Sequence, residues 1–175
     1  PITRAMDVNE SANEIAAPEA VIVAVAEKDI QAVLADIPGV WRDRLVLLQN
    51  ELLPRDWQQH GLDNTTVISV WFEKKPGMDF KVLIPSPVFG PHAQLIADAL
   101  ATLSIPTTVL STADELETEL LIKNVYILTT NIAGLETGGT VSELWSNHQS
   151  VARAVAADVW RCRPAWSATN STMTS

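Results

Sequence analysis

Two adjacent polar residues of this 175-residue chain follow a run that predicts a buried strand. The run is Arg44–Leu48 (RLVLL), and Gln49 and Asn50 come directly after it. In open α/β sheets, ligands bind outside the carboxyl ends of parallel strands, so an asparagine at this point can face a ligand. The same side chain could instead cap the helix that is predicted to follow, and both interpretations stay open.

Lys123 and Asn131 form a second candidate pair, on a long predicted helix. At about 3.6 residues per turn, each four-residue step shifts the direction of a side chain by only ~40°, so the two residues lie on broadly one stripe. The net charge of −9 opposes the approach of an anionic substrate, which makes a buried lysine a useful local cation. The simpler alternatives are a solvated lysine paired with Glu119 and an asparagine in a structural hydrogen bond.

The acidic composition argues against whole classes of partner. Twenty-one acidic residues against twelve basic ones repel a phosphate backbone and an anionic membrane surface, so we expect no nucleic-acid and no membrane partner. The three histidines stand far apart, with no carboxylate or cysteine at metal-ligand spacing, and we predict no metal site. The single cysteine, Cys162, excludes an internal disulfide. Together with the lack of an export leader, it predicts a cytoplasmic location.

The elements that would position these residues follow from apolar periodicity, and the apolar run Ala20–Ala26 predicts a strand covered on both faces of a parallel sheet. Pro76 and Gly77 predict an antiparallel hairpin between two further strands. Thr112 and Glu115 predict a capping box at the start of the helix that carries Lys123. The predicted strands are Ala20–Ala26, Arg44–Leu48, Thr66–Phe72, Phe80–Ile84 and Thr107–Leu110. The predicted helices are Asp29–Leu34, Leu52–His60, Ala93–Leu103, about Asp114–Leu135 and Val141–Trp160.

Three segments, in this order, resemble the ketopantoate reductase family. LVLLQNELL, from Leu45, resembles the family's apolar strand that ends in Gln/His-Asn-Gly. FGPHAQLIADALATLSIPTTVL resembles the stretch in which a glycine precedes a helix and a short strand leads to the interdomain helix. Lys123 matches the catalytic lysine of that interdomain helix, and Asn131 matches the second of its two asparagines. Glu51 stands where the family has glycine, and Ile127 stands where it has the first asparagine.

The resemblance implies an NADPH-dependent reductase of a small 2-keto acid. It implies that Lys123 is catalytic, that Asn131 and Asn50 bind the substrate, and that Asn50 and Gln49 lie beside the cofactor. Hydride would pass from the nicotinamide to the carbonyl carbon, while the positive charge of Lys123 stabilises the developing alkoxide.

The resemblance also implies a domain organisation and a truncation. We expect an incomplete Rossmann-like parallel sheet in residues 1–111, a partial all-helical domain in residues 112–161, and a disordered tail in residues 162–175. No G-x-G-x-x-G turn occurs in the sequence, and the family would place it upstream of residue 1, so the chain looks truncated at both ends. Weak dinucleotide binding follows, because this turn supplies most donors to the diphosphate.

Two other functions are compatible with the same residues. The chain could be a non-catalytic Rossmann-like remnant or interaction protein, an alternative that the missing turn, Glu51 and Ile127 favour. It could also belong to another branch of the lysine-dependent hydroxyacid dehydrogenases, since fold alone does not decide function. Loss of a first central strand would leave the edge beside Ala20–Ala26 unpaired, which predicts a homodimer or aggregation through that edge.

Overall fold

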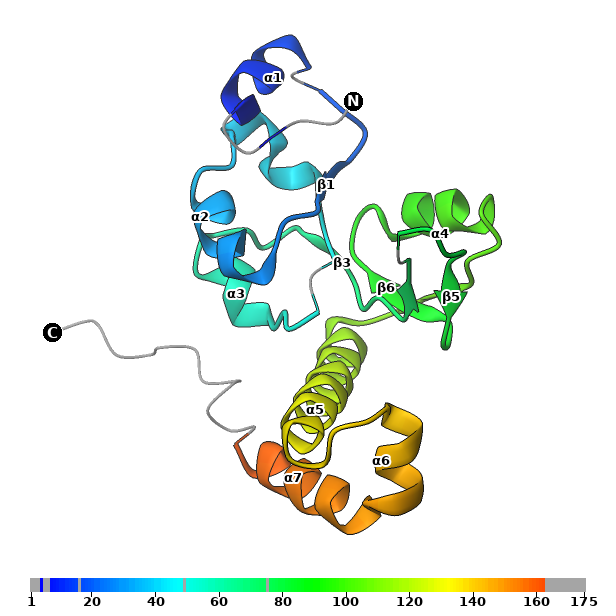
Figure 1. Cartoon of the computed structure of the whole chain (residues 1–175). Helices are drawn as coiled ribbons and strands as arrows, with labels where there is room; N and C mark the ends of the chain where they lie inside the picture. The colour runs from blue at the N-terminus through cyan, green and yellow to red at the C-terminus, as the bar shows by residue number, and fades with distance from the viewer. Residues whose placement is uncertain (1–3, 5–6, 16, 49, 75, 163–175) are drawn as a thin grey trace, which may run out of the picture.

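The computed structural model describes residues 4, 7–15, 17–48, 50–74 and 76–162, which form an α/β fold (Figure 1). Its main sheet has five strands in the order β1-β2-β3-β6-β7, and β4 pairs separately with β5. The strands are β1 (Val21–Val23), β2 (Leu45–Leu47), β3 (Thr66–Ile68), β4 (Phe72–Glu73), β5 (Lys81–Val82), β6 (Ser86–Phe89) and β7 (Thr107–Val109). The predicted fold class, a Rossmann-like sheet followed by helices, is confirmed.

Seven α-helices and two 3-10 helices complete the described part of the chain. The α-helices are α1 (Val8–Glu14), α2 (Ile30–Ala35), α3 (Pro54–Gln58), α4 (Ala93–Ala101), α5 (Ala113–Thr137), α6 (Val141–Asn147) and α7 (Gln149–Arg161). The 3-10 helices are η2 (Glu27–Asp29) and η3 (Gly39–Arg44). Gln49 and residues 163–175 of the predicted tail lie outside the described residues. Among the described helices, none combines the length and the apolarity that crossing a membrane requires.

The first three strands of the sheet are parallel, as the apolar runs predict. All three residues of β2 are buried, because β2 lies between β1 and β3 with core on both faces. The prediction that the first strand is also covered on both faces is wrong, since Ile22 of β1 is 57% exposed. β1 is the edge strand, and the helix on the Ile22 side, α4, packs against β3, β6 and β7 instead. The position of β1 at the edge of the described sheet was expected, and the homodimer through this strand stays a prediction.

The sheet reverses direction between β3 and β6, which pair antiparallel, whereas β6 and β7 pair parallel. β6 was not predicted, because Pro85 and Pro87 argue against a central strand. The structure accommodates Pro87 through its carbonyl, which accepts a hydrogen bond of 2.9 Å from the backbone N–H of Ser69. The carboxyl ends of β6 and β7 therefore lie at the opposite edge of the sheet from those of β1, β2 and β3.

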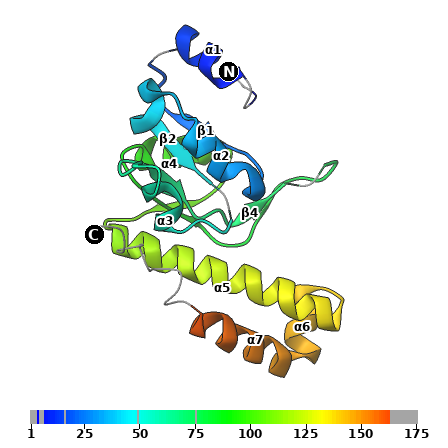
Figure 2. The same ribbon diagram turned by 90° about the vertical axis from the view of Figure 1, so that its left-hand side faces the viewer.

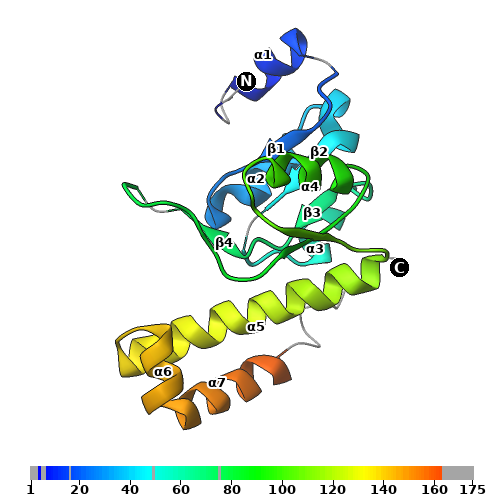
Figure 3. The ribbon, with the colours of Figure 1, turned by 90° about the vertical axis from the view of Figure 1, so that its right-hand side faces the viewer.

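The connection from β3 to β6 is the predicted antiparallel hairpin, and its tip forms the β4–β5 pair. The predicted strand Thr66–Phe72 is divided, with its first part in the main sheet and Phe72 in the hairpin. Figures 2 and 3 show this hairpin projecting as an arm away from the sheet. The arm carries four exposed apolar side chains: Met78, Phe80, Leu83 and Ile84.

Helices cover the two faces of the sheet unequally. On one face, residues of α2, α3 and the first turns of α5 join Leu45, Leu47 and Val67 in a single buried cluster. On the other face, Val46 and Ile68 belong to a smaller cluster that includes α4. Figure 1 shows α2 and α3 on the opposite side of the sheet from α4. Polar side chains at the ends of the strands, between these two layers of helices, can contact a ligand.

The helices after β7 form a small bundle in which α7 packs along α5 (Figure 3). The prediction of one continuous helix over Val141–Trp160 is wrong, because His148, at φ −132° and ψ 33°, separates α6 from α7. The break lets both helices pack on α5, where Ala133, Leu144 and Ala152 form a common buried cluster.

Candidate functional site

The helix α5 runs from the end of the sheet at which β7 finishes towards the opposite end, at which β3 finishes. Thr112, three residues after β7, caps α5: its hydroxyl accepts from Glu115 N at 3.2 Å, and the Glu115 carboxylate accepts from Thr112 N at 3.2 Å. The predicted capping box is thus confirmed. Ten residues at about 1.5 Å per residue carry the helix roughly 15 Å back along the sheet. Lys123 therefore reaches the edge at which β3 ends.

Lys123 is buried at this edge, with only 6% of its surface exposed. Its Nζ donates a hydrogen bond to the carbonyl oxygen of Val70, two residues beyond β3, and lies 4.4 Å from the centre of the Trp71 ring. The ring of Tyr126, one helical turn further along α5, lies 5.2 Å from that of Trp71 at an interplanar angle of 55°. The alternative interpretation, a solvated lysine paired with Glu119, does not describe this side chain.

Burial gives Lys123 an unusual acidity for a lysine. Removal of the ammonium from water lowers the pKa of Lys123 from 10.5 to about 8. A lysine with this pKa holds its proton at neutral pH but releases it far more readily than a solvated lysine does. Such a group can donate a proton, accept one, or stabilise negative charge on a neighbouring oxygen.

Two further polar side chains, those of Ser69 and Trp71, follow β3 on the side of the sheet that faces Lys123. Ser69 Oγ and Trp71 Nε1 are both buried, and neither has a hydrogen-bond partner among the described residues. Native proteins satisfy most buried polar atoms, so two such atoms on neighbouring residues of one strand end require an explanation. Sequence reasoning classed Trp71 with the core aromatics and did not single out Ser69.

Asn131 does not lie beside Lys123. The side chain of Asn131 is exposed, and eight helical residues separate it from Lys123, which corresponds to a rise of roughly 12 Å along α5. Ile127, between them, is half-buried. Lys123 is buried whereas Asn131 is exposed, and the two residues can contact one ligand only if that ligand extends along α5.

Asn50 lies in the exposed turn after β2, and its backbone N–H donates to the Glu27 carboxylate. Glu27 follows β1, so this contact ties together the ends of two adjacent parallel strands. Burial, and then the negative charges of Glu51 and Asp56, raise the pKa of the Glu27 carboxyl, while the backbone N–H groups of Asn50 and Glu51 oppose this rise. Asn50 is exposed, so its side chain can face a ligand or solvent, whereas Gln49 is outside the described residues.

Asn124 is a functional candidate that sequence reasoning missed. It is 5% exposed, and its Nδ2 donates to the carbonyl oxygens of Leu52, at 3.3 Å, and Leu120, at 2.9 Å. The hydrogen bond to Leu52 links α5 to the segment after β2, and the hydrogen bond from Lys123 to Val70 links α5 to the end of β3. The signal was available, because asparagine is as unfavourable within an apolar helix at position 124 as at position 131.

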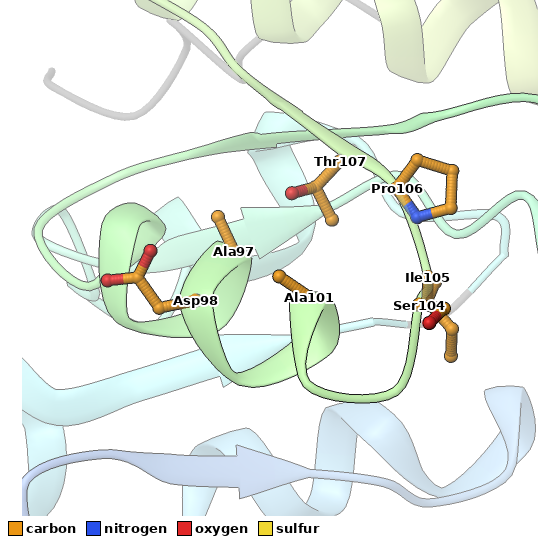
Figure 4. Close-up of a pocket in the computed structure, with 7 residues that line it drawn as sticks. All are labelled: Ala97, Asp98, Ala101, Ser104, Ile105, Pro106 and Thr107. Atoms are coloured by element: carbon orange, nitrogen blue, oxygen red, sulfur yellow. The ribbon is translucent and has the colours of Figure 1, made fainter.

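Two surface hollows in the described part of the chain lie away from these residues. One of about 480 Å³ lies between the end of α4 and the start of β7 (Figure 4). Its lining residues are Ala97, Asp98, Ala101, Ser104, Ile105, Pro106 and Thr107. Another, of about 370 Å³, lies beside Gly90 at the sheet edge where β6 ends. Neither hollow is lined by Lys123, Asn131 or Asn50. In the described part of the chain, no group of three His, Cys, Asp or Glu side chains is placed to hold a metal ion.

Comparison with known proteins identifies no family for this chain. No protein-family model matches it, and no curated protein matches its sequence. It is similar to a solved structure of a conserved hypothetical protein from Sinorhizobium meliloti 1021, with 19% sequence identity and a TM-score of 0.44. The alignment covers 86% of this chain and 50% of that chain, so this chain spans half the length of the structure that it matches.

Proposed function

We propose that this chain carries the substrate half of an NADPH-dependent reductase of a small 2-keto acid, of the ketopantoate reductase type. One observation supports this most: Lys123 is buried at the carboxyl ends of the parallel strands, the edge where open α/β sheets bind ligands. A buried ammonium at that edge suits an anionic 2-keto acid, because it offsets locally the repulsion from a chain of net charge −9.

In this proposal Lys123 stabilises the alkoxide that forms when the carbonyl carbon of the substrate accepts hydride. Its pKa of about 8 also allows it to donate the proton that the alkoxide takes up. Asn50 contacts a further polar group of the substrate from the end of β2, whereas Asn131, roughly 12 Å from Lys123 along α5, is too far away to contact a small 2-keto acid. NADPH, when bound, supplies the hydride.

The described residues do not fit the diphosphate of NADPH. The segments after β1 and β2 present Glu27, Asp29, Glu51 and Asp56, and these carboxylates repel phosphate. The sequence has no G-x-G-x-x-G turn, whose backbone N–H groups would bind it. We therefore expect the chain alone to bind NADPH weakly.

Calorimetry of NADPH binding to this chain tests the cofactor part of the proposal, and saturable micromolar binding would overturn it. The substrate part is tested by titrating the chain with a panel of 2-keto acids and repeating the titration with Lys123→Ala. We expect Lys123→Ala to weaken binding by roughly tenfold or more, as loss of a charged hydrogen bond does. Lys81→Ala, in the exposed arm, is the matched control. Equal affinities of wild type and Lys123→Ala would refute the assignment of Lys123.

The projecting arm favours a second function, that of an interaction protein. The arm exposes Met78, Phe80, Leu83 and Ile84, and clustered exposed apolar side chains are typical of surfaces that bind another protein. This function predicts that replacing Leu83 and Ile84 by serine abolishes partner capture. The same change would leave the affinity for 2-keto acids unaltered.

A further inference from the structure

The side chains at the end of β3 alternate between the two faces of the sheet. Val67 belongs to the buried cluster that includes Leu116 and Leu120 of α5, whereas Ile68 belongs to the cluster with α4. The ladder continues past β3, because Ser69 N donates to Pro87 O at 2.9 Å. Since strand side chains alternate with a period of two, Ser69 and Trp71 point to the α5 face, like Val67. The contact of Trp71 with Lys123 agrees with this direction.

Three hydrogen-bond donors therefore gather between the end of β3 and α5. They are Ser69 Oγ, Trp71 Nε1 and Lys123 Nζ, on side chains that are 1%, 7% and 6% exposed. The ammonium has Val70 O as one acceptor, and it can donate three hydrogen bonds. The serine hydroxyl and the indole N–H have no partner among the described residues.

An acceptor oxygen with negative charge is the partner that suits this set. An indole N–H and an ammonium can only donate, and a serine hydroxyl can donate as well. Hydrogen bonds to an ionised oxygen are roughly twice as strong as those between neutral groups, and a buried ammonium strengthens them further. A neutral amine or a cation would instead face donors and positive charge.

We propose that Ser69 and Trp71 are ligand-binding residues, which donate hydrogen bonds from Oγ and Nε1 to a carboxylate or carbonyl oxygen of a small oxo acid held against Lys123. This inference deepens the proposed function, because it names the groups that receive the substrate oxygen. The ring of Trp71 then makes two contacts: the face of the ring contacts the ammonium of Lys123, and the indole N–H binds the ligand.

The test uses pyruvate as the probe and Trp71→Phe and Ser69→Ala as variants of the whole chain. Phenylalanine keeps an aromatic ring beside Lys123 but has no N–H, and alanine removes only the hydroxyl. We expect each variant to weaken pyruvate binding by about tenfold, measured by calorimetry with and without NADP⁺. Trp57→Phe, at a tryptophan that is 6% exposed on α3, is the matched control and should stay within about twofold of wild type.

Nuclear magnetic resonance of the ¹⁵N-labelled protein gives a direct readout. The sequence has six tryptophans, and the indole signal that is missing from Trp71→Phe identifies the Nε1–H of Trp71. We expect this signal to shift downfield on addition of pyruvate, since a hydrogen bond to a carboxylate deshields the proton. An unshifted Trp71 signal at saturating pyruvate would overturn the assignment.

Stability separates ligand binding from a structural role. Buried donors without partners cost folding free energy, so their removal in Ser69→Ala should leave the ligand-free protein as stable as wild type or more stable. Ser69→Ala and Trp71→Phe variants that lose stability but bind pyruvate like wild type would overturn the inference. So would a wild-type chain that binds no pyruvate.

The same experiments distinguish this inference from the proposed reduction. Pyruvate binding that weakens in Lys123→Ala, Ser69→Ala and Trp71→Phe would support both the proposed function and the oxygen site. Binding that weakens in Lys123→Ala but not in Ser69→Ala or Trp71→Phe would support the proposed function and refute the oxygen site. Binding that weakens in Ser69→Ala and Trp71→Phe but not in Lys123→Ala would refute the role that the proposed function gives to Lys123.

Discussion

The ammonium nitrogen of Lys123 lies 4.4 Å from the centre of the Trp71 ring, at the edge of the sheet where β3 ends. A cation over an aromatic face is stabilised by about 0.5–2 kcal/mol, and it recovers only part of the hydration free energy that a lysine loses on burial.

Replacing Lys123 by methionine should stabilise the protein at pH 7. The unfolded chain keeps the lysine proton up to its ordinary pKa of 10.5, whereas the folded chain releases it near 8. The unfolded state therefore binds more protons between these two pH values. The destabilisation caused by the buried ammonium is largest below pH 8 and disappears as the pH approaches 10.5. At pH 7 the cost is at most about 3 kcal/mol. Urea unfolding of wild type and Lys123→Met across pH 6–10.5 measures it, and a pH-independent difference would contradict the explanation.

Asn124→Leu should destabilise the protein by about 1–3 kcal/mol, because the carbonyl oxygen of Leu52 loses a buried donor. Asn131→Leu, on the exposed side of the same helix, is the matched control and should change stability by less than about 0.5 kcal/mol. Thermal unfolding compares the two variants. If both had the same small effect, the link from α5 to the segment after β2 would not contribute to stability.

Gly90→Ala should be among the most damaging single substitutions, with a loss of more than about 2 kcal/mol. A Cβ at this position, where φ is +124°, would lie 2.5 Å from Thr66 Cα and 2.7 Å from Thr65 O. Gly134→Ala meets no atom within 4 Å and sits inside α5, so it should stabilise by about 0.5–1 kcal/mol. Denaturant midpoints that moved in the same direction for both variants would be inconsistent with this contrast.

Thr112→Ala should cost about 1 kcal/mol, since it removes the acceptor for Glu115 N at the start of α5. Thr112→Ser keeps that oxygen and should stay close to wild type. The helix also positions Lys123, so circular dichroism together with 2-keto acid titration would show whether fraying at Thr112 reaches the site. Identical stabilities of the alanine and serine variants would mean that the cap contributes little.

Apolar runs were sufficient to predict the parallel half of the sheet. β1 and β2 are short, β-branched and leucine-rich, and their pairing follows from the helix between them. β6 could not be found in this way, because Pro85 and Pro87 oppose a strand locally and pairing with β3 and β7 overrides them. The break at His148 had a local signal, since Ser146, Asn147 and His148 are three weak helix formers in succession.

The candidate site was predictable only in part. The resemblance selected Lys123, and the structure shows that this residue is buried at a strand end. Val70 and Trp71 lie beside Lys123 although about 50 residues separate them along the chain, so tertiary packing alone brings them together. Asn124 is adjacent to Lys123 in the sequence, but no motif pointed to it. Periodicity could not show that Lys123 is buried while Asn131, roughly 12 Å further along α5, is exposed.

Because strand direction reverses after β3, the loops that follow β1, β2 and β3 lie at one end of the sheet and those that follow β6 and β7 lie at the other. The two sets of loops can therefore change in sequence and length independently. Insertions after β1, β2 or β3 would lengthen loops around Lys123 and could alter which ligands reach it. Insertions after β6 or β7 would instead enlarge the opposite end, beside Gly90, and leave the lysine untouched. In a directed-evolution library, the segments that follow Val23, Leu47 and Ile68 are therefore the ones in which added residues can change ligand preference.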